Sequence, residues 1–217
     1  MEVINIGDKD SIFNQFMLEI RDIDIQKDRM RFRRNIERIG EIFAYEISKK
    51  MTCKEKKIMT PLGESIERII SNQPVLATIL RAGIPLHQGV LNYFDNSDNC
   101  FIAAYRTPEE GEGFDIKVEY ISSPELEGRE VILCDPMLAT GRSMVLALET
   151  ILRKGKPKHV HIVSVISSSE GIDFLKNNTP IENCTIWVGA EDKEMTDQAY
   201  IFPGLGDAGD LAFGNKS

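Results

Sequence analysis

Nine consecutive residues have types and spacing that point to a specific chemistry. They directly follow the apolar run 131–134, so they begin where a buried strand is expected to end. In an open α/β sheet, ligands bind outside the carboxyl ends of the strands. A helical pattern follows from residue 143, and the first amides of a helix attract anions. We therefore expect a phosphate at this turn, which consists of Asp135, Pro136, Met137, Leu138, Ala139, Thr140, Gly141, Arg142 and Ser143.

The side chains of this segment suit a sugar phosphate. Gly141 can adopt a positive φ and let the backbone approach a phosphate, while Thr140 and Ser143 can donate hydroxyl hydrogen bonds. Asp135 would repel a phosphate, so it suits sugar hydroxyls or a metal-bound water. The alternative is a strand-to-helix turn with an ordinary cap. The segment matches neither a Walker loop nor the glycine fingerprint of dinucleotide sites.

A second candidate segment follows the apolar run 75–80. Arg81 stands before Ala82 and Gly83, which combines a fixed cation with unhindered backbone amides. That combination suits a diphosphate. The alternative is an arginine that ends a strand and is solvated at the surface.

A third candidate is Arg106, at the end of a predicted strand over 100–105. It leads into an acidic, glycine-containing stretch over 107–113. A segment of this kind between two strands is expected to be a mobile hairpin arm that closes over a bound ligand and excludes water.

The fourth candidate segment, residues 200–210, holds three glycines and a proline. We expect no regular backbone hydrogen bonding over this stretch, so its amides and carbonyls need other partners. A planar nucleobase with alternating donors and acceptors is such a partner, because a wrong base would leave those groups unpaired. The alternative is a flexible tail.

Taken together, these segments resemble type I phosphoribosyltransferases, and among them the uracil phosphoribosyltransferases. Asp-Pro-Met-Leu-Ala-Thr-Gly at 135–141 is similar to the phosphoribosyl-diphosphate loop of that family. Arg-Ala-Gly at 81–83 is similar to its pyrophosphate loop, and Pro-Gly-Leu-Gly-Asp-Ala-Gly-Asp at 203–210 to its uracil-binding signature. The resemblance covers residues 17–214. It implies an α/β type I phosphoribosyltransferase fold: a mostly parallel central sheet flanked by helices, an N-terminal helical extension, a hairpin arm and a C-terminal base-binding loop.

The resemblance also implies roles for individual residues. The implied catalytic residues are Arg81, Arg106, Asp135 and Asp207. Phosphoribosyl diphosphate would contact Arg81, Ala82, Gly83, Arg106, Asp207 and all nine residues from Asp135 to Ser143. Uracil would contact Ile201, Gly206, Asp207 and Ala208, and Asp207 is the candidate base that deprotonates it. Mg²⁺ is expected through the oxygens of the donor and water, with no residue assigned as a direct metal ligand.

Three positions depart from the pattern of the family. Thr107 stands where an acid is usual, Arg142 where a glycine is common and Leu211 where an arginine is common. If Arg142 has a negative φ, it fits without strain and its guanidinium could reinforce phosphate binding. A positive φ there would be strained by about 1 kcal/mol. We expect the negative φ.

The implied reaction converts uracil and phosphoribosyl diphosphate to uridine monophosphate and diphosphate, a pyrimidine salvage step in the cytoplasm. The resemblance favours a homodimer or homotetramer and leaves a GTP effector open. One alternative is a phosphoribosyl-diphosphate-binding RNA regulator with reduced catalysis, which would bind RNA through an arginine-rich helix. Another is an enzyme for a different base. The arginines of that helix are Arg29, Arg31, Arg33, Arg34 and Arg38.

Composition limits the class of protein. A chain of 217 residues with 42% hydrophobic content suffices for one α/β domain, expected over 1–217 with 1–70 as a helical extension. The net charge of −8 argues against general nucleic-acid binding. The sequence shows neither a signal peptide nor an apolar run long enough to span a membrane. Four scattered cysteines indicate reduced thiols, and the three histidines are expected to be structural or exposed.

Hydrophobic periodicity predicts alternating strands and helices, which is typical of a parallel sheet covered on both faces. Trp187 is expected in the core. The predicted strands cover 75–80, 100–105, 118–121, 131–134, 160–166 and 186–188. The predicted helices cover about 26–49, 63–70, 86–93, 143–153 and 171–176, with a loop over 52–61.

Overall fold

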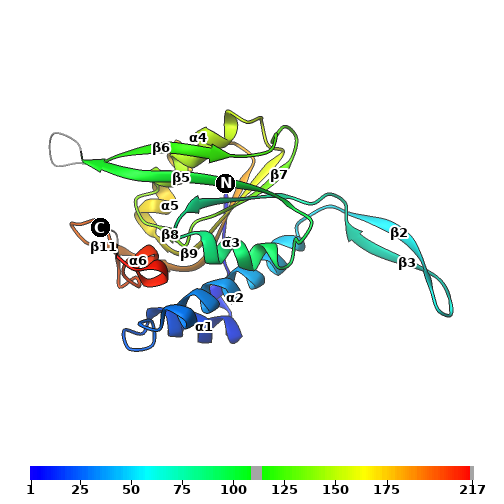
Figure 1. Ribbon diagram of the computed structural model, residues 1–217, viewed down its shortest axis with the longest axis horizontal. Helices are drawn as coiled ribbons and strands as arrows, with labels where there is room; N and C mark the ends of the chain where they lie inside the picture. The colour runs from blue at the N-terminus through cyan, green and yellow to red at the C-terminus, as the bar shows by residue number, and fades with distance from the viewer. Residues whose placement is uncertain (109–113, 216–217) are drawn as a thin grey trace.

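The computed structural model describes residues 1–108 and 114–215, and its centre is a sheet of eight strands (Figure 1). Seven lie side by side in the order β1, β10, β9, β7, β4, β5, β6, and β8 pairs with β9. Within this sheet, and among the residues described, only β5 and β6 pair in antiparallel fashion, which confirms the predicted mostly parallel sheet. The strands are β1 (Glu2–Asn5), β4 (Val75–Leu80), β5 (Asp98–Pro108), β6 (Phe114–Ser122), β7 (Glu130–Cys134), β8 (Met137–Leu138), β9 (His159–Ser168) and β10 (Cys184–Asp192).

Helices cover both faces of this sheet. Consecutive residues of a strand point to opposite faces, so a continuous apolar strand packs against a layer of helices on each side. Leu76 and Ile132 join one hydrophobic cluster with α1, α2 and α3. Val75 and Leu133 join a second cluster with α4 and α5. Burial on both faces explains why the strands are continuous apolar runs in the sequence. The helices are α1 (Ile12–Arg21), α2 (Arg29–Ser48), α3 (Ile84–Leu91), α4 (Arg142–Leu152), α5 (Ser169–Asn178) and α6 (Ala208–Phe213).

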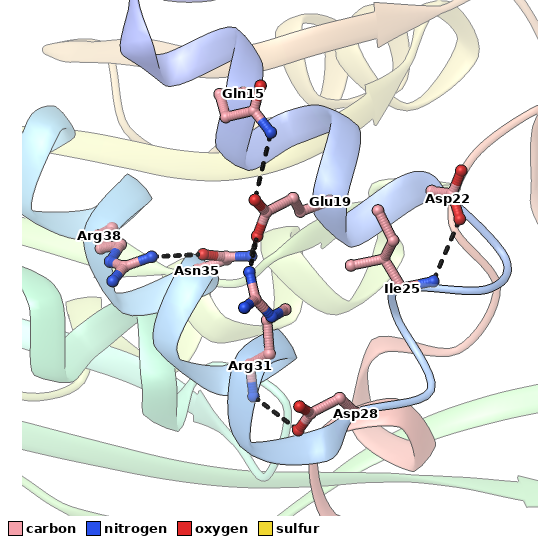
Figure 2. Close-up of polar contacts among 8 residues, drawn as sticks. All are labelled: Gln15, Glu19, Asp22, Ile25, Asp28, Arg31, Asn35 and Arg38. Carbon is pink, nitrogen blue, oxygen red and sulfur yellow. Dashed lines mark hydrogen bonds and ion pairs between the residues drawn. The ribbon is translucent and has the colours of Figure 1, made fainter.

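A polar network around the buried Asn35 joins α1 to α2 (Figure 2). The carboxylate of Glu19 on α1 accepts hydrogen bonds from Asn35 at 2.7 Å and Arg31 at 2.9 Å, both on α2. Asn35 is fully buried, and its Oδ1 accepts from Arg38 at 3.0 Å. The bond from Asn35, with those from Gln15 and Arg31, lowers the pKa of Glu19 to about 2. The two helices therefore form one rigid layer.

The structure corrects the prediction for residues 52–70. The predicted loop and short helix are instead β2 (Cys53–Thr60) and β3 (Gly63–Ile70), an antiparallel hairpin that projects away from the body (Figure 1). The isoleucines of β3 are spaced as on a helix face, but β-branched residues favour a strand once a partner strand pairs with them. Residues 1–70 are thus only partly helical, since β1 also joins the central sheet.

Two other expectations concern the arm and the membrane. β5 and β6 form the predicted hairpin, paired from Phe101 with Ser122 outward, while residues 109–113 at its tip lie outside the described residues. No helix within 1–108 and 114–215 is long and apolar enough to cross a membrane. Trp187 is buried as predicted, and its indole N–H donates to His161 Nδ1 at 3.2 Å.

Candidate active site

The phosphate loop, our name for residues 135–143, is held by the neighbouring strand β9. The Asp135 amide donates to Val163 O at 3.1 Å, and Pro136 O accepts from two β9 amides. Met137 and Leu138 form β8 against the end of β9. Ser168, the last residue of β9, donates from its Oγ to Ala139 O at 2.6 Å. Regular strand pairing thus continues into the loop and fixes its path.

The end of this loop leads directly into α4. Gly141 has a φ of +79°, as predicted, and a Cβ there would lie 2.9 Å from Gly171 O. Arg142 is the first residue of α4 and is exposed, and its φ is not positive, which confirms the unstrained fit. Among the described residues no side chain caps α4. Its first amides therefore remain available to an anion, with the half-buried Thr140 and Ser143 beside them.

The arginine loop, residues 81–83, packs against the strand that precedes the phosphate loop. A Cβ on Gly83 would lie 2.2 Å from Thr78 Oγ1 and 2.8 Å from Cys134 O, so only glycine fits. Gly83 therefore lies next to the residue before Asp135. Burial, with the nearby Asp135 charge, raises the pKa of the Cys134 thiol, so no thiolate charge arises beside Asp135 at neutral pH.

Arg81 joins the arginine loop to the end of the chain. Its Nη2 donates to Asp210 Oδ1 at 2.9 Å and also to Gly214 O. Its Nε is buried and has no hydrogen-bond partner among the described residues. A guanidinium has five N–H donors, so Arg81 keeps donors for an anion while it holds Asp210.

The base loop, our name for residues 200–210, is more regular than expected. It contains β12 (Ile201–Phe202), paired with β11 (Glu194–Met195), and it runs into α6 at Ala208. Asp207 caps α6, since its Oδ1 accepts from the Asp210 amide at 2.9 Å. The expectation of no regular bonding is wrong at both ends, since 201–202 form β12 and 208–210 begin α6, with Gly209 inside the helix. Ile201 and Ala208 are buried, whereas Gly206 and the Asp207 carboxylate are exposed.

Three of the four predicted segments meet at the carboxyl edge of the sheet. A Cβ on Gly209 would lie 3.8 Å from Ala82 Cβ and from Arg81 Nε, which places the base loop against the arginine loop. Gly83 in turn touches the strand end before the phosphate loop. The backbone of Arg106 pairs with Ile116 in the arm, and its side chain lies outside the described residues.

Comparison with known proteins bears on this arrangement. The family model described as uracil phosphoribosyltransferase matches residues 9–215. The chain belongs to the uracil phosphoribosyltransferase family. A uracil phosphoribosyltransferase of Porphyromonas gingivalis is 53% identical over 216 residues, covering 100% of both chains. One of Pyrococcus furiosus is 36% identical over 203 residues, covering 92% of this chain and 85% of its own. The structure of the AQ2163 protein from Aquifex aeolicus superposes with a TM-score of 0.86 at 27% identity and covers 98% of each chain.

Sequence reasoning missed the residues that hold the loops of this family member in place. Arg21, Ser168 and Asp192 lie far from the motifs in sequence, and no local pattern distinguishes them. It also missed a cavity of about 430 Å³ beside the base loop. Lys27, from the connection between α1 and α2, and Arg29, the first residue of α2, line that cavity together with Gly206 and Asp207.

Proposed function

We propose that the chain transfers the phosphoribosyl group of phosphoribosyl diphosphate to uracil, releasing uridine monophosphate and diphosphate for pyrimidine salvage. In this reaction the bond from the ribose C1′ to the diphosphate oxygen breaks, a bond from uracil N1 to C1′ forms, and the N1 proton leaves. The observation that carries the proposal is the meeting of the phosphate, arginine and base loops at one sheet edge. Family membership supports it.

The phosphate loop is proposed to anchor the donor through its 5′-phosphate. The uncapped amides of α4, the backbone of Gly141 and the hydroxyls of Thr140 and Ser143 supply donors there. The exposed guanidinium of Arg142 would add a cation. Binding at this remote group positions the reacting C1′. Asp135, half-buried at the end of β7, would accept from the ribose hydroxyls.

The leaving diphosphate is proposed to lie against Arg81, the amides of Ala82 and Gly83, and Arg106 of the arm. Arginine donors stabilise the negative charge that builds up as the C1′–O bond breaks. Mg²⁺ is proposed to bind through the oxygens of the donor and through water, and the Asp135 and Asp207 carboxylates would accept hydrogen bonds from that water. When bound, Mg²⁺ would supply further charge neutralisation for the diphosphate.

Uracil is proposed to contact the backbone at Ile201, Gly206 and Ala208, with Asp207 accepting the N1 proton. The Asp207→Asn change tests the last role sharply, because asparagine can still cap α6. We expect kcat to fall by about 10²-fold, within the usual contribution of a general base. Near-full turnover by this variant would leave Asp207 with a positioning role only.

The decisive experiment measures transfer from phosphoribosyl diphosphate to radiolabelled uracil in the presence of Mg²⁺. Competition by unlabelled hypoxanthine, guanine and orotate tests the choice of base. Uracil transfer resisting all three competitors would support the proposal. Transfer to another base, or no transfer together with salt-sensitive RNA binding in a gel shift, would contradict it.

The arginines of α2, which the RNA-binding alternative needs, already have structural uses within the chain. Each of four donates to a partner of its own: Arg31, Arg33, Arg34 and Arg38.

We further propose that the chain forms a homo-oligomer through the β2–β3 hairpin. A hairpin of two strands is at best marginally stable alone in water, and this one exposes Met59, Leu62 and Ile66 by 58% or more. A second copy covering it would bury these side chains. Met59→Glu with Ile66→Glu should therefore shift the mass measured by light scattering toward the monomer, while Lys54→Ser should not. An unchanged mass would locate the interface elsewhere.

Three predictions from the sequence stay proposals. A single domain is supported by one central sheet that takes strands from Glu2 to Asp192. A cytoplasmic location agrees with four free cysteines, Cys53, Cys100, Cys134 and Cys184. A GTP effector is tested by adding GTP to the uracil transfer assay.

A further inference from the structure

The last residues of two neighbouring strands each hold one of the substrate loops. In the register of β9 with β10, Ser168 and Asp192 are partners, and each ends its strand. Ser168 holds the phosphate loop through its bond to Ala139 O. Asp192 holds the base loop, since its Oδ2 accepts from the Gly204 amide at 2.9 Å. The separation of the two loops is thereby tied to the register of two adjacent strands.

Arg21 completes the contact on the base-loop side. Its two Nη atoms donate to the two carboxylate oxygens of Asp192 at 2.9 and 3.0 Å, and Nη1 also reaches Gly204 O at 3.4 Å. The Asp192 side chain is only 10% exposed, so this pair is little screened by water. A two-pronged arginine–carboxylate contact fixes direction as well as distance.

Both sides of the contact are rigid. Arg21 is the last residue of α1, and Glu19 two positions earlier is tied to Asn35 and Arg31 of α2 (Figure 2). Gly204 has a φ of +55°, and a Cβ there would lie 2.2 Å from Ile201 O, so the turn has one compact shape. Gly206 and Asp207 follow within three residues, and any shift of the turn moves them.

We infer that Arg21 and Asp192 are positioning residues for the nucleobase, which set the base loop at the distance from the phosphate loop that one nucleotide requires. The inference rests on the proposed function. Neither residue touches the substrates; both act through Gly204. Loss of the pair therefore affects uracil capture more than donor binding, because the phosphate loop, held by Ser168, keeps its contacts with the donor and only the donor contact of Asp207 is disturbed.

The test compares Michaelis constants for the two substrates in purified full-length variants. Arg21→Gln and Asp192→Asn should each raise KM for uracil at least about tenfold, with a clearly smaller rise in KM for phosphoribosyl diphosphate, of about threefold or less. Arg21→Lys keeps the charge but loses the two-pronged contact, so it should lie between wild type and Arg21→Gln. Ser168→Ala should show the reverse pattern, with the larger change in KM for the donor.

The matched control is Arg34→Gln. Arg34 also pairs with a carboxylate, at 2.7 Å, in the same helical layer, but its partner is Glu37 of α2 and not a loop residue. Both Michaelis constants should stay near wild type in this variant. The double variant Arg21→Gln with Asp192→Asn should raise KM for uracil no further than the more damaging single change does. Both substitutions disrupt the same hold on Gly204, so their effects should not add.

Two readouts separate the inference from the proposed function. If wild type transfers uracil and the Arg21 and Asp192 variants keep its KM, the inference is overturned while the function stands, even if their melting temperatures fall. If wild type transfers no uracil, the proposed function fails. Hydrogen exchange then still tests the contact: faster exchange of the Gly204 amide in Arg21→Gln, but not in Arg34→Gln, supports the positioning pair, and unchanged exchange contradicts it.

Discussion

The phosphate loop and the base loop lie at the same sheet edge but are held in different ways. The phosphate loop continues the pairing of β7 and β9 and closes on Gly141, so its contacts are mainly backbone. The base loop and helix α6, which continues from it, are held mainly by side chains from distant parts of the chain, among them Arg21, Arg33 and Arg81. Arg33, for example, donates to Ala212 O at 2.7 Å.

This difference predicts which substitutions each loop tolerates. Backbone pairing depends little on side-chain identity, so the phosphate loop should be sensitive mainly at positions where only glycine fits. Side-chain contacts are lost with a single residue, so the base loop should be sensitive to changes far away in sequence. The predictions below test that contrast, from the largest expected effect to the smallest.

Arg81→Ala should have the largest effect, because Arg81 serves both to hold the end of the chain and to bind substrate. It holds Asp210 and Gly214 of the C-terminal segment and is proposed to bind the diphosphate. We expect kcat/KM to fall by about 10²–10³-fold, the loss typical of removing one donor to a developing charge. Steady-state kinetics measure this. Arg129→Ala, which removes a surface pair with Asp98 at 3.1 Å, serves as the control and should be near wild type. Unchanged kinetics for Arg81→Ala would remove this residue from the site.

Gly141→Ala should damage the phosphate loop alone. A side chain at a φ of +79°, 2.9 Å from Gly171 O, is expected to destabilise the fold by about 1–2 kcal/mol and to raise KM for phosphoribosyl diphosphate. Gly128→Ala is a matched control with a φ of +66° and open space around the new Cβ. It should share the backbone strain, seen in denaturant melts, without the change in KM. A rise in KM for uracil alone would contradict the contrast between the loops.

Acid should weaken the fold at a place remote from both loops. Burial, with repulsion from His159 and Lys50, lowers the pKa of His161 from 6.5 to about 3. The unfolded chain therefore binds a proton below pH 6.5 that the folded chain excludes, and stability is lost as the pH falls. The contribution of His161 to the slope should approach about 1.4 kcal/mol per pH unit between pH 6.5 and 4.5, and His87 and His159, whose pKa values burial also lowers, add to it. Urea melts across this range measure it. His161→Gln should make the free energy of unfolding depend less steeply on pH. An equally steep dependence in this variant would assign the loss of stability to other groups.

Arg142→Ala should have the smallest effect. Arg142 is exposed at the start of α4, where an added cation is screened by water. We expect KM for phosphoribosyl diphosphate to rise about two- to fivefold, which corresponds to less than about 1 kcal/mol. The rise should disappear at high salt. A rise in KM of about tenfold or more that does not depend on salt would mean that Arg142 makes a desolvated contact with the phosphate.

Much of the fold could be read from the sequence, because the relevant signals are local. The buried strands β4, β7 and β9 are continuous apolar runs, and α2 has a clear apolar stripe. The hairpin β2–β3 could not be read, because its residues are almost all exposed and its strands pair only with each other. The helix α6 was missed because its cap, Asp207, lies inside a glycine-rich motif.

The sequence by itself determined the chemistry of each loop and the parallel sheet, since residue types, glycine positions and hydrophobic period act over a few neighbouring residues. The tertiary structure alone decided which distant side chains hold those loops. Arg21 and Asp192 are 171 positions apart in the sequence, and such a separation by itself does not predict a contact. Their contact arises because β10 ends beside the last turn of α1 in the folded chain, and no pattern along the sequence encodes that proximity.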